Sequence, residues 1–338
     1  MAETINRSAC ASLLAVTLLF CVGCSDGDGR SDRVAPDVTV DGFNLGGMDL
    51  HWAADLIDRA AGRVMIPPVD GRVSGDGHCI PGRWGLQLNT AELKRRVALA
   101  PSGSRLLAAY ELLPPTCPRE CPNLPVREAA AGTRSVGLMV NVAWGEEHLP
   151  RILSILREQD ARATFFVMGF WAEDHPELLQ AAVRMGHEIG VHGYRDAHPR
   201  DMSPDALRED LQVSIAALGR LSGARPTLYT PHYGEVTDAI TETAADLGLT
   251  TILWTADTAD WMTDSVPRML DRVLPETRDG AFILMHPTEN TAAFLSEYLP
   301  RLKDMGLTAR SCSGTLNRIP ATAAGLDDLF RRMETPSE

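Results

Sequence analysis

The sequence predicts an α/β protein in which a barrel-like array of β/α units follows a small α+β domain. The chain has 338 residues, and at roughly 150 residues per domain this length suggests two domains. From residue 135 onward, short apolar runs of strand type alternate with amphipathic helical patterns. Such alternation is typical of a parallel sheet or barrel.

The N-terminus has the pattern of a bacterial export signal. A polar start with Arg7 precedes an apolar run over residues 9–22, which is shorter than the roughly 20 residues that a membrane span needs. Small residues precede Cys24, which resembles a lipobox and implies cleavage before Cys24 and a lipid on its sulfur. We therefore expect a signal peptide at 1–23, a tether at 24–37, and an exported protein anchored to a bacterial membrane, in the periplasm or at the cell surface. Ordinary signal cleavage nearby is the alternative.

Charge and cysteine content narrow the classes of partner. The formal net charge is -13, which disfavours nucleic acid because phosphate binding needs clustered Lys and Arg. Four cysteines follow the predicted anchor, namely Cys79, Cys117, Cys121 and Cys312. In an exported protein they allow two disulfides, with three pairings open. Four cysteines can also bind zinc, but no CxxC pair is present, so we favour disulfides.

The first domain is expected at 38–114. A strand-like run at 38–47 ends in a glycine turn, and a helix at 48–63 is predicted by the apolar spacing of Leu50, Ile57 and Ala61. A second helix is expected at 88–100 with Thr90 as its N-cap. This unit carries no cluster of catalytic residue types, and a linker follows at 115–134.

The second domain is expected at 135–316, followed by a tail at 317–338. Its predicted strands cover residues 136–142, 164–168, 188–191, 227–230, 250–254 and 281–285. Its predicted helices cover residues 149–158, 176–185, 204–221, 237–247 and 291–305.

Polar residues follow five of these strands, at the ends where active sites of parallel β/α folds gather. They are Asn141, His192, the run 229–234 with Thr230 and Tyr233, the run 257–261 with Asp257 and Trp261, and His286. We therefore expect these side chains to share one site.

Four strings in this domain, ATFFVMG, HEIGVHGY, WTADTADW and ILMHPT, are similar to motifs of the polysaccharide deacetylases with NodB homology, carbohydrate esterase family 4. They occur in the family's order over about 180 residues. The strings NVAWGEE and LMHPTENT are most similar to the YlxY-like branch. The resemblance implies a distorted (β/α) barrel of NodB type.

The family's activity is hydrolysis of N-acetyl groups on amino sugars. The resemblance implies a divalent metal, usually zinc, held by one Asp and two His, with a second Asp as general base and a His as general acid. The implied substrate is an N-acetylated envelope or extracellular polysaccharide, such as peptidoglycan or a chitin-like glycan.

Carried over residue by residue, the resemblance makes His192 the first metal histidine. His198 is the second, because Pro199 follows it, but the family spaces these histidines four apart and here the spacing is six. Asp196 stands at the fourth position and is the alternative ligand. Asp257 matches an orienting aspartate and His286 the general acid.

Two family motifs are altered. The first carries paired aspartates, as in TFDDG, and the corresponding stretch here is NVA at 141–143. Asn141 can hydrogen-bond but cannot act as a base. Candidates for an unusual base are the nearby Glu146 and Glu147, or a carboxylate such as Asp196; the two glutamates are otherwise charges favoured by a helix N-terminus. Thr230 replaces the Arg of the third motif.

Aromatic residues are candidates for sugar contacts. Tyr233 and Trp261, with Thr230, are expected to bind substrate, whereas packing is the alternative for the tryptophans. His187 and His232 are expected to be structural or to lie on the surface.

Three hypotheses follow. The first is a metal-dependent deacetylase that uses an unusual base. The second is a catalytically degenerate member that binds glycan without hydrolysis, and the third is a structural envelope lipoprotein.

Overall fold

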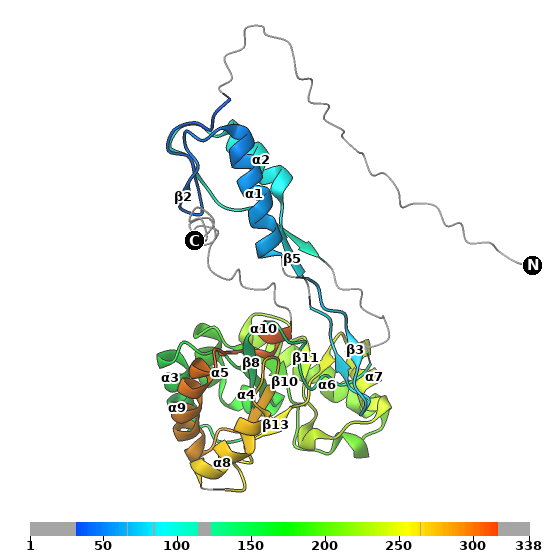
Figure 1. Ribbon diagram of the computed structural model, residues 1–338. Coiled ribbons are helices and arrows are strands. Elements are labelled where there is room, and N and C mark those ends of the chain that lie inside the picture. The colour runs from blue at the N-terminus through cyan, green and yellow to red at the C-terminus, as the bar shows by residue number, and fades with distance from the viewer. Residues whose placement is uncertain (1–31, 66, 84, 114–122, 264, 317–338) are drawn as a thin grey trace, which may run out of the picture.

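The computed structural model describes residues 32–65, 67–83, 85–113, 123–263 and 265–316 (Figure 1). The predicted signal peptide, Cys24, Cys117, Cys121 and the expected tail lie outside these residues. Among the described residues, no helix has the length and apolar character needed to cross a bilayer.

The first unit packs two helices against short strands. Asp49 caps the first helix by accepting bonds from two backbone N–H groups, and Asn89 caps the second by accepting from the Glu92 N–H. The N-cap is therefore Asn89 rather than the predicted Thr90, and the second helix begins one residue earlier than that cap predicted, at Thr90. Its elements are β1 (Thr39–Val40), β2 (Phe43–Asn44), α1 (Leu50–Val64), β5 (Gly85–Leu88), α2 (Thr90–Leu99), β6 (Arg105–Leu106) and β7 (Tyr110–Leu113).

The core of this unit reaches into the predicted tether. Val34 is buried with Leu56, Ile57 and Leu93 in one apolar cluster. In contrast, the hairpin β3 (Arg72–Val73) and β4 (Cys79–Ile80) leaves this unit and runs to the second (Figure 1). Cys79 there forms a β-bridge with Val126 and joins the core of the second unit.

The second unit is a curled parallel sheet with strand order β12-β11-β10-β9-β8-β14-β13, and β15 pairs with the start of β8. This confirms the predicted α/β class. The strands are β8 (Ser135–Val142), β9 (Thr164–Val167), β10 (Glu188–Val191), β11 (Leu228–Tyr229), β12 (Thr250–Thr251), β13 (Ala256–Asp257), β14 (Phe282–Met285) and β15 (Thr308–Arg310).

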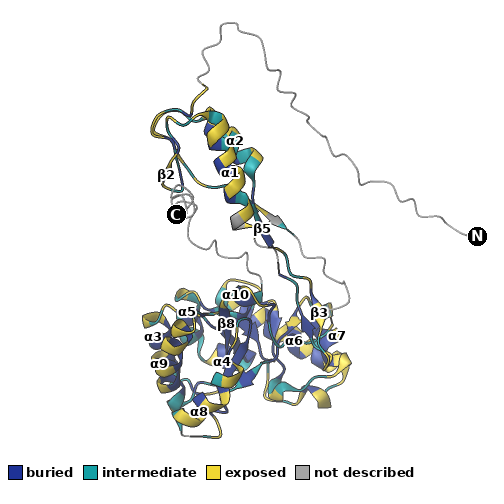
Figure 2. Ribbon diagram, viewed as in Figure 1, coloured by how far each residue is buried: buried dark blue, intermediate teal, exposed yellow. Residues whose placement is uncertain are grey.

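Helices cover the outer face of this sheet, with their exposed faces toward solvent (Figure 2). Ser203 and Thr237 cap α6 and α7 with their hydroxyl oxygens. The helices are α3 (Leu149–Glu158), α4 (Gly169–Asp174), α5 (Pro176–Arg184), α6 (Pro204–Ser222), α7 (Asp238–Asp246), α8 (Val266–Val273), α9 (Glu289–Asp304) and α10 (Cys312–Leu316), with short 3-10 turns at Pro199–Asp201, His232–Gly234 and Leu274–Glu276.

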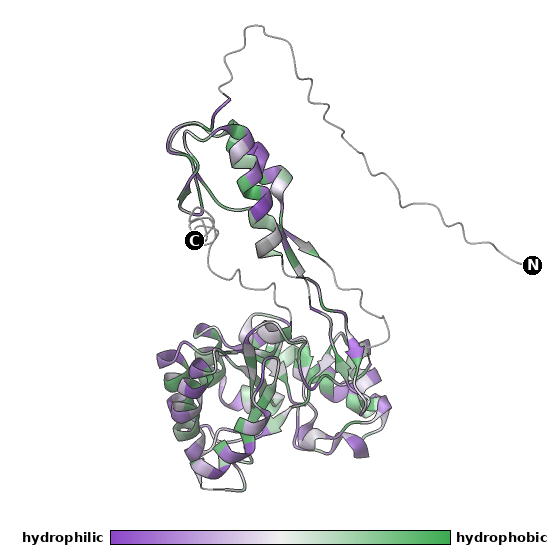
Figure 3. Cartoon of the chain, viewed as in Figure 1, coloured by the Kyte–Doolittle hydropathy of each residue, from purple (hydrophilic) through white to green (hydrophobic). Residues whose placement is uncertain are grey.

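Side chains alternate between the two faces of each strand. In β8, Leu138 and Val140 pack under the helices, whereas Met139 points into the curl of the sheet with Phe166 and Leu284. Hydrophobic segments accordingly gather in the sheet, and polar ones on the helices (Figure 3). The inner apolar cluster forms the floor on which the strand-end residues stand.

Of the disulfide pairings that the sequence leaves open, the one that joins Cys79 to Cys312 is not formed. Cys79 and Cys312 both lie in the inner cluster, and no disulfide joins them. Burial raises the pKa of the Cys312 thiol well above its usual value, which keeps this cysteine protonated and unreactive.

Candidate functional site

Four polar residues share the inner face directly above the apolar floor. Each lies two positions after an inner residue of its strand, and so points the same way: Asn141 follows Met139, His192 follows Gly190, Thr230 follows Leu228 and His286 follows Leu284. All four are at the carboxyl ends of parallel strands, so they face one region. This is the arrangement that the sequence predicted for the strand-end residues.

A chain of hydrogen bonds joins several predicted site residues through His232. His192 Nδ1 lies 2.8 Å from the Thr230 carbonyl oxygen, and His192 Nε2 lies 3.0 Å from His232 Nδ1. His232 Nε2 lies 2.9 Å from Asp196 Oδ1, which also accepts a 2.8 Å bond from the Tyr233 hydroxyl. His232, expected to be structural or superficial, is thus the central member of the site.

The protonation state of each residue in this hydrogen-bond chain follows from its contacts. Burial, with the nearby His232, lowers the pKa of His192 to about 3, so its ring is neutral. Its Nδ1 donates to the Thr230 carbonyl, so its Nε2 can only accept from His232. The Tyr233 hydroxyl lowers the pKa of Asp196, which stays ionised. His232 can donate both of its hydrogen bonds, to His192 and to Asp196, only when both ring nitrogens are protonated. Burial opposes that charge and lowers the pKa of His232.

His198 lies apart from His192. Its Nδ1 is 2.9 Å from Glu235 Oε1, and its ring stacks on Tyr233 with centroids 4.0 Å apart and planes 14° apart. His232 and Tyr233 therefore lie between the two predicted metal histidines. Two extra residues in the loop carry His198 past the position that Asp196 occupies.

The predicted zinc site, made of His192, His198 and Asp196, is not assembled. Among the described residues, no group of three His, Cys, Asp or Glu side chains is placed to hold a metal ion. The orienting contact is present, since His192 Nδ1 meets a carbonyl as in many metal-bound histidines. The Nε2 that would face the metal instead meets His232, so the donor set does not fit zinc.

Gly145 fixes how the first motif aligns. Its φ is +84°, and an added Cβ would collide with the Pro287 carbonyl oxygen, so only glycine suits this turn. Aligning Gly145 with the glycine of TFDDG places Ala143 and Trp144 at the paired aspartates and Asn141 at the threonine. This alignment differs from the one with residues 141–143, and in both alignments the stretch carries no carboxylate.

His286 is held by a carboxylate that the sequence analysis left without a role. The buried Asp260 accepts a 2.6 Å bond from the His286 N–H, and its Oδ1 lies 2.9 Å from His286 Nδ1. Thr291 donates a further bond to Asp260. The spacing in WTADTADW, which puts Asp260 three residues after Asp257, was the available signal.

Asp257, the predicted orienting residue, lies at the end of β13. Its carboxylate accepts a 2.8 Å bond from the Ala259 N–H, and burial raises its pKa. The Arg272 guanidinium meets the Asp257 carbonyl oxygen rather than its carboxylate. Asp257 therefore shapes the loop that leads to Asp260.

Glu146, the predicted unusual base, points toward α4. Its carboxylate accepts a 3.5 Å bond from Trp171 Nε1 and lies 4.0 Å from His175 Nε2. A bond from its own backbone N–H is the main cause of its lowered pKa. These contacts differ from those of the strand-end histidines.

Two polar atoms at the strand ends, Asn141 Oδ1 and Thr230 Oγ1, have no hydrogen-bond partner within the part of the chain that the structure describes. Aromatic side chains rim the same region: Trp144, Tyr233 and Trp261 are 45%, 55% and 58% exposed. Such exposure of large apolar side chains beside polar groups is typical of a binding surface.

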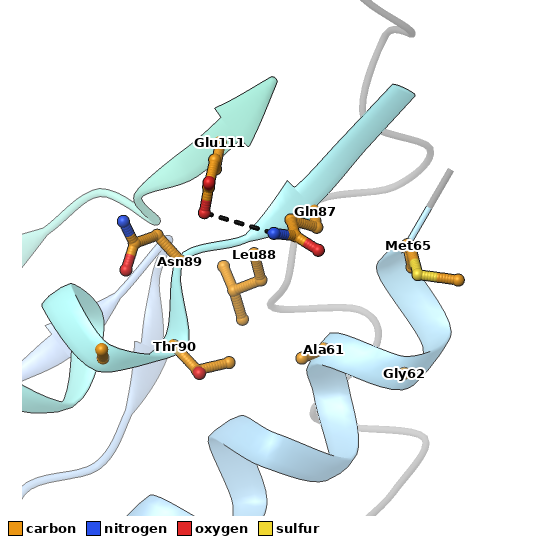
Figure 4. Close-up of a pocket in the computed structure, with 9 residues that line it drawn as sticks. Ala61, Gly62, Met65, Gln87, Leu88, Asn89, Thr90 and Glu111 are labelled. Carbon is orange, nitrogen blue, oxygen red and sulfur yellow. Dashed lines mark hydrogen bonds between the residues drawn. The ribbon is translucent and has the colours of Figure 1, made fainter. Parts of the chain in front are cut away.

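A separate pocket lies in the first unit, between α1 and the start of α2 (Figure 4). Its volume is about 410 Å³, and Gln87 donates a 3.2 Å bond to Glu111 at its edge. Its lining has no titratable group besides Glu111, so we assign no chemistry to it.

Comparison with known proteins places this geometry in a family. A family model for polysaccharide deacetylase matches residues 128–252. The peptidoglycan-N-acetylglucosamine deacetylase of Bacillus cereus is 31% identical over 165 residues, which are 47% of this chain and 77% of that protein. The chain belongs to the polysaccharide deacetylase family. Members of this family are hydrolases of N-acetyl amide bonds and generally depend on a divalent metal.

Two further relatives locate the chain within the family. The uncharacterized protein YlxY of Bacillus subtilis is 29% identical over 243 residues, covering 71% of this chain and 76% of that protein. The structure of a CE4 family pseudoenzyme from Bacillus anthracis has a TM-score of 0.67 and 27% identity, covering 78% of this chain and 94% of that one. The predicted NodB-type fold and YlxY-like resemblance are thereby confirmed. A mutant of the same pseudoenzyme is described as having restored enzymatic activity.

Proposed function

We propose that this protein binds an N-acetylated glycan of the cell envelope at its strand-end site without hydrolysing it. One observation carries the proposal: Gly145, held at positive φ against the Pro287 carbonyl, supports an alignment in which Ala143 and Trp144 replace the paired aspartates. The protein would thus keep the family's fold and lose the family's turnover.

The chemistry of amide hydrolysis supports the loss. Loss of a general base alone costs about 10²–10⁴ in rate. Zinc needs about three protein ligands in a catalytic site, and no such group is assembled among the described residues, including around His192. Its Nε2 is already hydrogen-bonded to His232. Zinc-dependent deacetylation, the first of the sequence hypotheses, is therefore the less favoured function.

What the site retains supports binding. His286 stays fixed by Asp260, and the exposed ring of Trp144 stacks on it. Asn141 and Thr230 keep unpartnered polar atoms at the strand ends. Sugar sites commonly combine such aromatic surfaces with a few polar groups.

The relatives support the choice of ligand. One is named for N-acetylglucosamine in peptidoglycan, and the Bacillus anthracis relative is called a pseudoenzyme. The lipobox-like segment before Cys24 supports export and a lipid anchor, which would hold the protein beside envelope glycans.

The test is to purify the chain without residues 1–23 and measure both binding and turnover. We expect N-acetylglucosamine oligomers to bind by calorimetry, and no acetate to be released with or without added zinc. Acetate release that disappears in His192→Ala would overturn the proposal in favour of an active deacetylase. Absence of glycan binding would overturn it in favour of a scaffold role.

A further inference from the structure

Trp144 presents an open aromatic face at the strand-end site. Its side chain is 45% exposed, and its ring is parallel to the His286 ring within 5°, with centroids 6.1 Å apart. One face of the indole therefore looks toward the imidazole, and much of the remaining surface meets solvent. A carboxylate at this position would offer no such surface.

The positions of the Trp144 indole and of the His286 ring on which it stacks are each fixed by neighbouring contacts. Next to Trp144, Gly145 packs so closely on Pro287 that no Cβ fits, which ties this loop to the segment after β14. His286 in turn is fixed by two bonds to the buried Asp260. A side chain fixed in this way loses little entropy when a ligand stacks on it.

Tyr233 provides a second open aromatic face. It is 55% exposed, its ring stacks on His198, and its hydroxyl donates to Asp196. Its φ of +60° is unusual for a tyrosine, and such strain persists where the surroundings enforce it. The surrounding contacts thus fix a flat ring at the surface.

The two faces meet the site histidines at different points. Tyr233 packs edge-on against His232, with ring centroids 4.0 Å apart. Trp144 stacks on His286, directly after β14. The two aromatic faces therefore contact different histidines, Trp144 at His286 and Tyr233 at His232.

We propose that Trp144 and Tyr233 are two sugar-stacking subsites, each taking one hexosamine ring of an extended glycan. A pyranose chair with equatorial substituents presents an apolar face of axial C–H groups, which matches an open aromatic surface and needs no charge. This inference rests on the proposed function and adds which residues grip the glycan. The replacement of a motif aspartate by Trp144 would thereby remove a catalytic carboxylate and add a surface that binds sugar.

Two subsites predict a dependence on chain length. An oligomer that spans both faces gains a second contact without a second loss of free translation. We expect affinity to rise at least about tenfold from the N-acetylglucosamine monomer to the tetramer.

The test is calorimetric titration of the tetramer into the chain without residues 1–23. Trp144→Ala and Tyr233→Ala should each weaken binding about tenfold, the size expected from the loss of one aromatic stack. Trp144→Phe, which keeps a flat ring, should restore most of the affinity. Trp52→Ala is the matched control, because Trp52 is 55% exposed on α1 of the first unit.

The outcomes separate this inference from the function on which it rests. If the wild-type protein binds no oligomer, the proposed function fails. If it binds and both alanine variants bind as tightly as Trp52→Ala, the function stands and the stacking subsites are wrong. Circular dichroism spectra and urea midpoints of each variant exclude unfolding as the cause of a loss.

Discussion

The imidazole of His192 is oriented as in a metal site, but it faces a second imidazole. Its Nδ1 meets the Thr230 carbonyl, a contact that commonly fixes metal-binding histidines. The other nitrogen meets His232, which continues to Asp196. The polar groups of the site are therefore hydrogen-bonded to one another and do not point at a shared metal position.

Burial also lowers the pKa of a second histidine, His187, as it does that of His192. Burial, helped by Arg162, lowers its pKa from 6.5 to about 4. Between these two pKa values His187 is protonated in the unfolded chain and neutral in the folded protein. The free energy of unfolding therefore decreases as the pH falls from about 6.5 toward 4. Between pH 7 and pH 5 this costs about 2 kcal/mol.

We predict that His187→Gln removes this part of the pH dependence. Urea unfolding at pH 7 and pH 5 measures it, and the wild-type free energy of unfolding should fall by about 2 kcal/mol more than that of the variant. His51→Gln, at an exposed position, serves as the control and should follow the wild type. Equal losses in wild type and His187→Gln would refute the assignment.

At the element scale, turns after strands decide which residues reach the site. Gly145 follows β8 at positive φ against the Pro287 carbonyl, and it sets Trp144 in place. Gly248 follows α7 at φ +73°, where an added Cβ would meet nothing within 4 Å. The two glycines share a backbone conformation and differ in crowding.

We predict that Gly145→Ala destabilises the protein far more than Gly248→Ala. The positive φ alone costs roughly 1–2 kcal/mol, and the collision at Gly145 raises the loss to about 3 kcal/mol or more. Urea unfolding of both variants measures the difference. Equal losses would mean that the turn relaxes and that the alignment fixed by Gly145 is not enforced.

Elements with strong periodicity were predicted well, and those without it were missed. The helix at Leu149–Glu158 and the strand at Glu188–Val191 match their predicted bounds. The hairpin of β3 and β4 was missed, because two-residue strands among glycines carry no alternation. Helix α4 was missed because it starts at Gly169, directly after a strand.

The site was predictable where residues directly end strands. His192, Thr230 and His286 were found in this way, since parallel strands bring their carboxyl ends together. His232 was missed because its position depends on the turn at Tyr233, whose φ is +60°. Backbone strain of this kind leaves no pattern in the sequence.

At the scale of the whole molecule, the two units are joined by a hairpin that shares the inner core. Cys79 on this hairpin packs with Val126 and Ile252 of the second unit. The predicted anchor at Cys24 precedes the first unit in the sequence.

We predict that the chain carries a lipid on Cys24. When it is expressed in bacteria with a labelled fatty acid, the wild type should incorporate label and sediment with membranes. Cys24→Ser should lose the label, whereas Cys10→Ser should keep it. Label that persists in Cys24→Ser, or a wild type that incorporates none, would contradict the lipobox interpretation.

The most direct test of the central claim is acetate release from N-acetylglucosamine oligomers in the presence of zinc, for the wild type and for Ala143→Asp/Trp144→Asp/Asp196→His. A control with Ala143→Asn/Trp144→Asn/Asp196→Gln changes the same positions without adding carboxylates or an imidazole. We expect release only from the first variant, because it restores both aspartates and the four-residue histidine spacing. Release by the wild type at a rate equal to that of the variant would contradict the account.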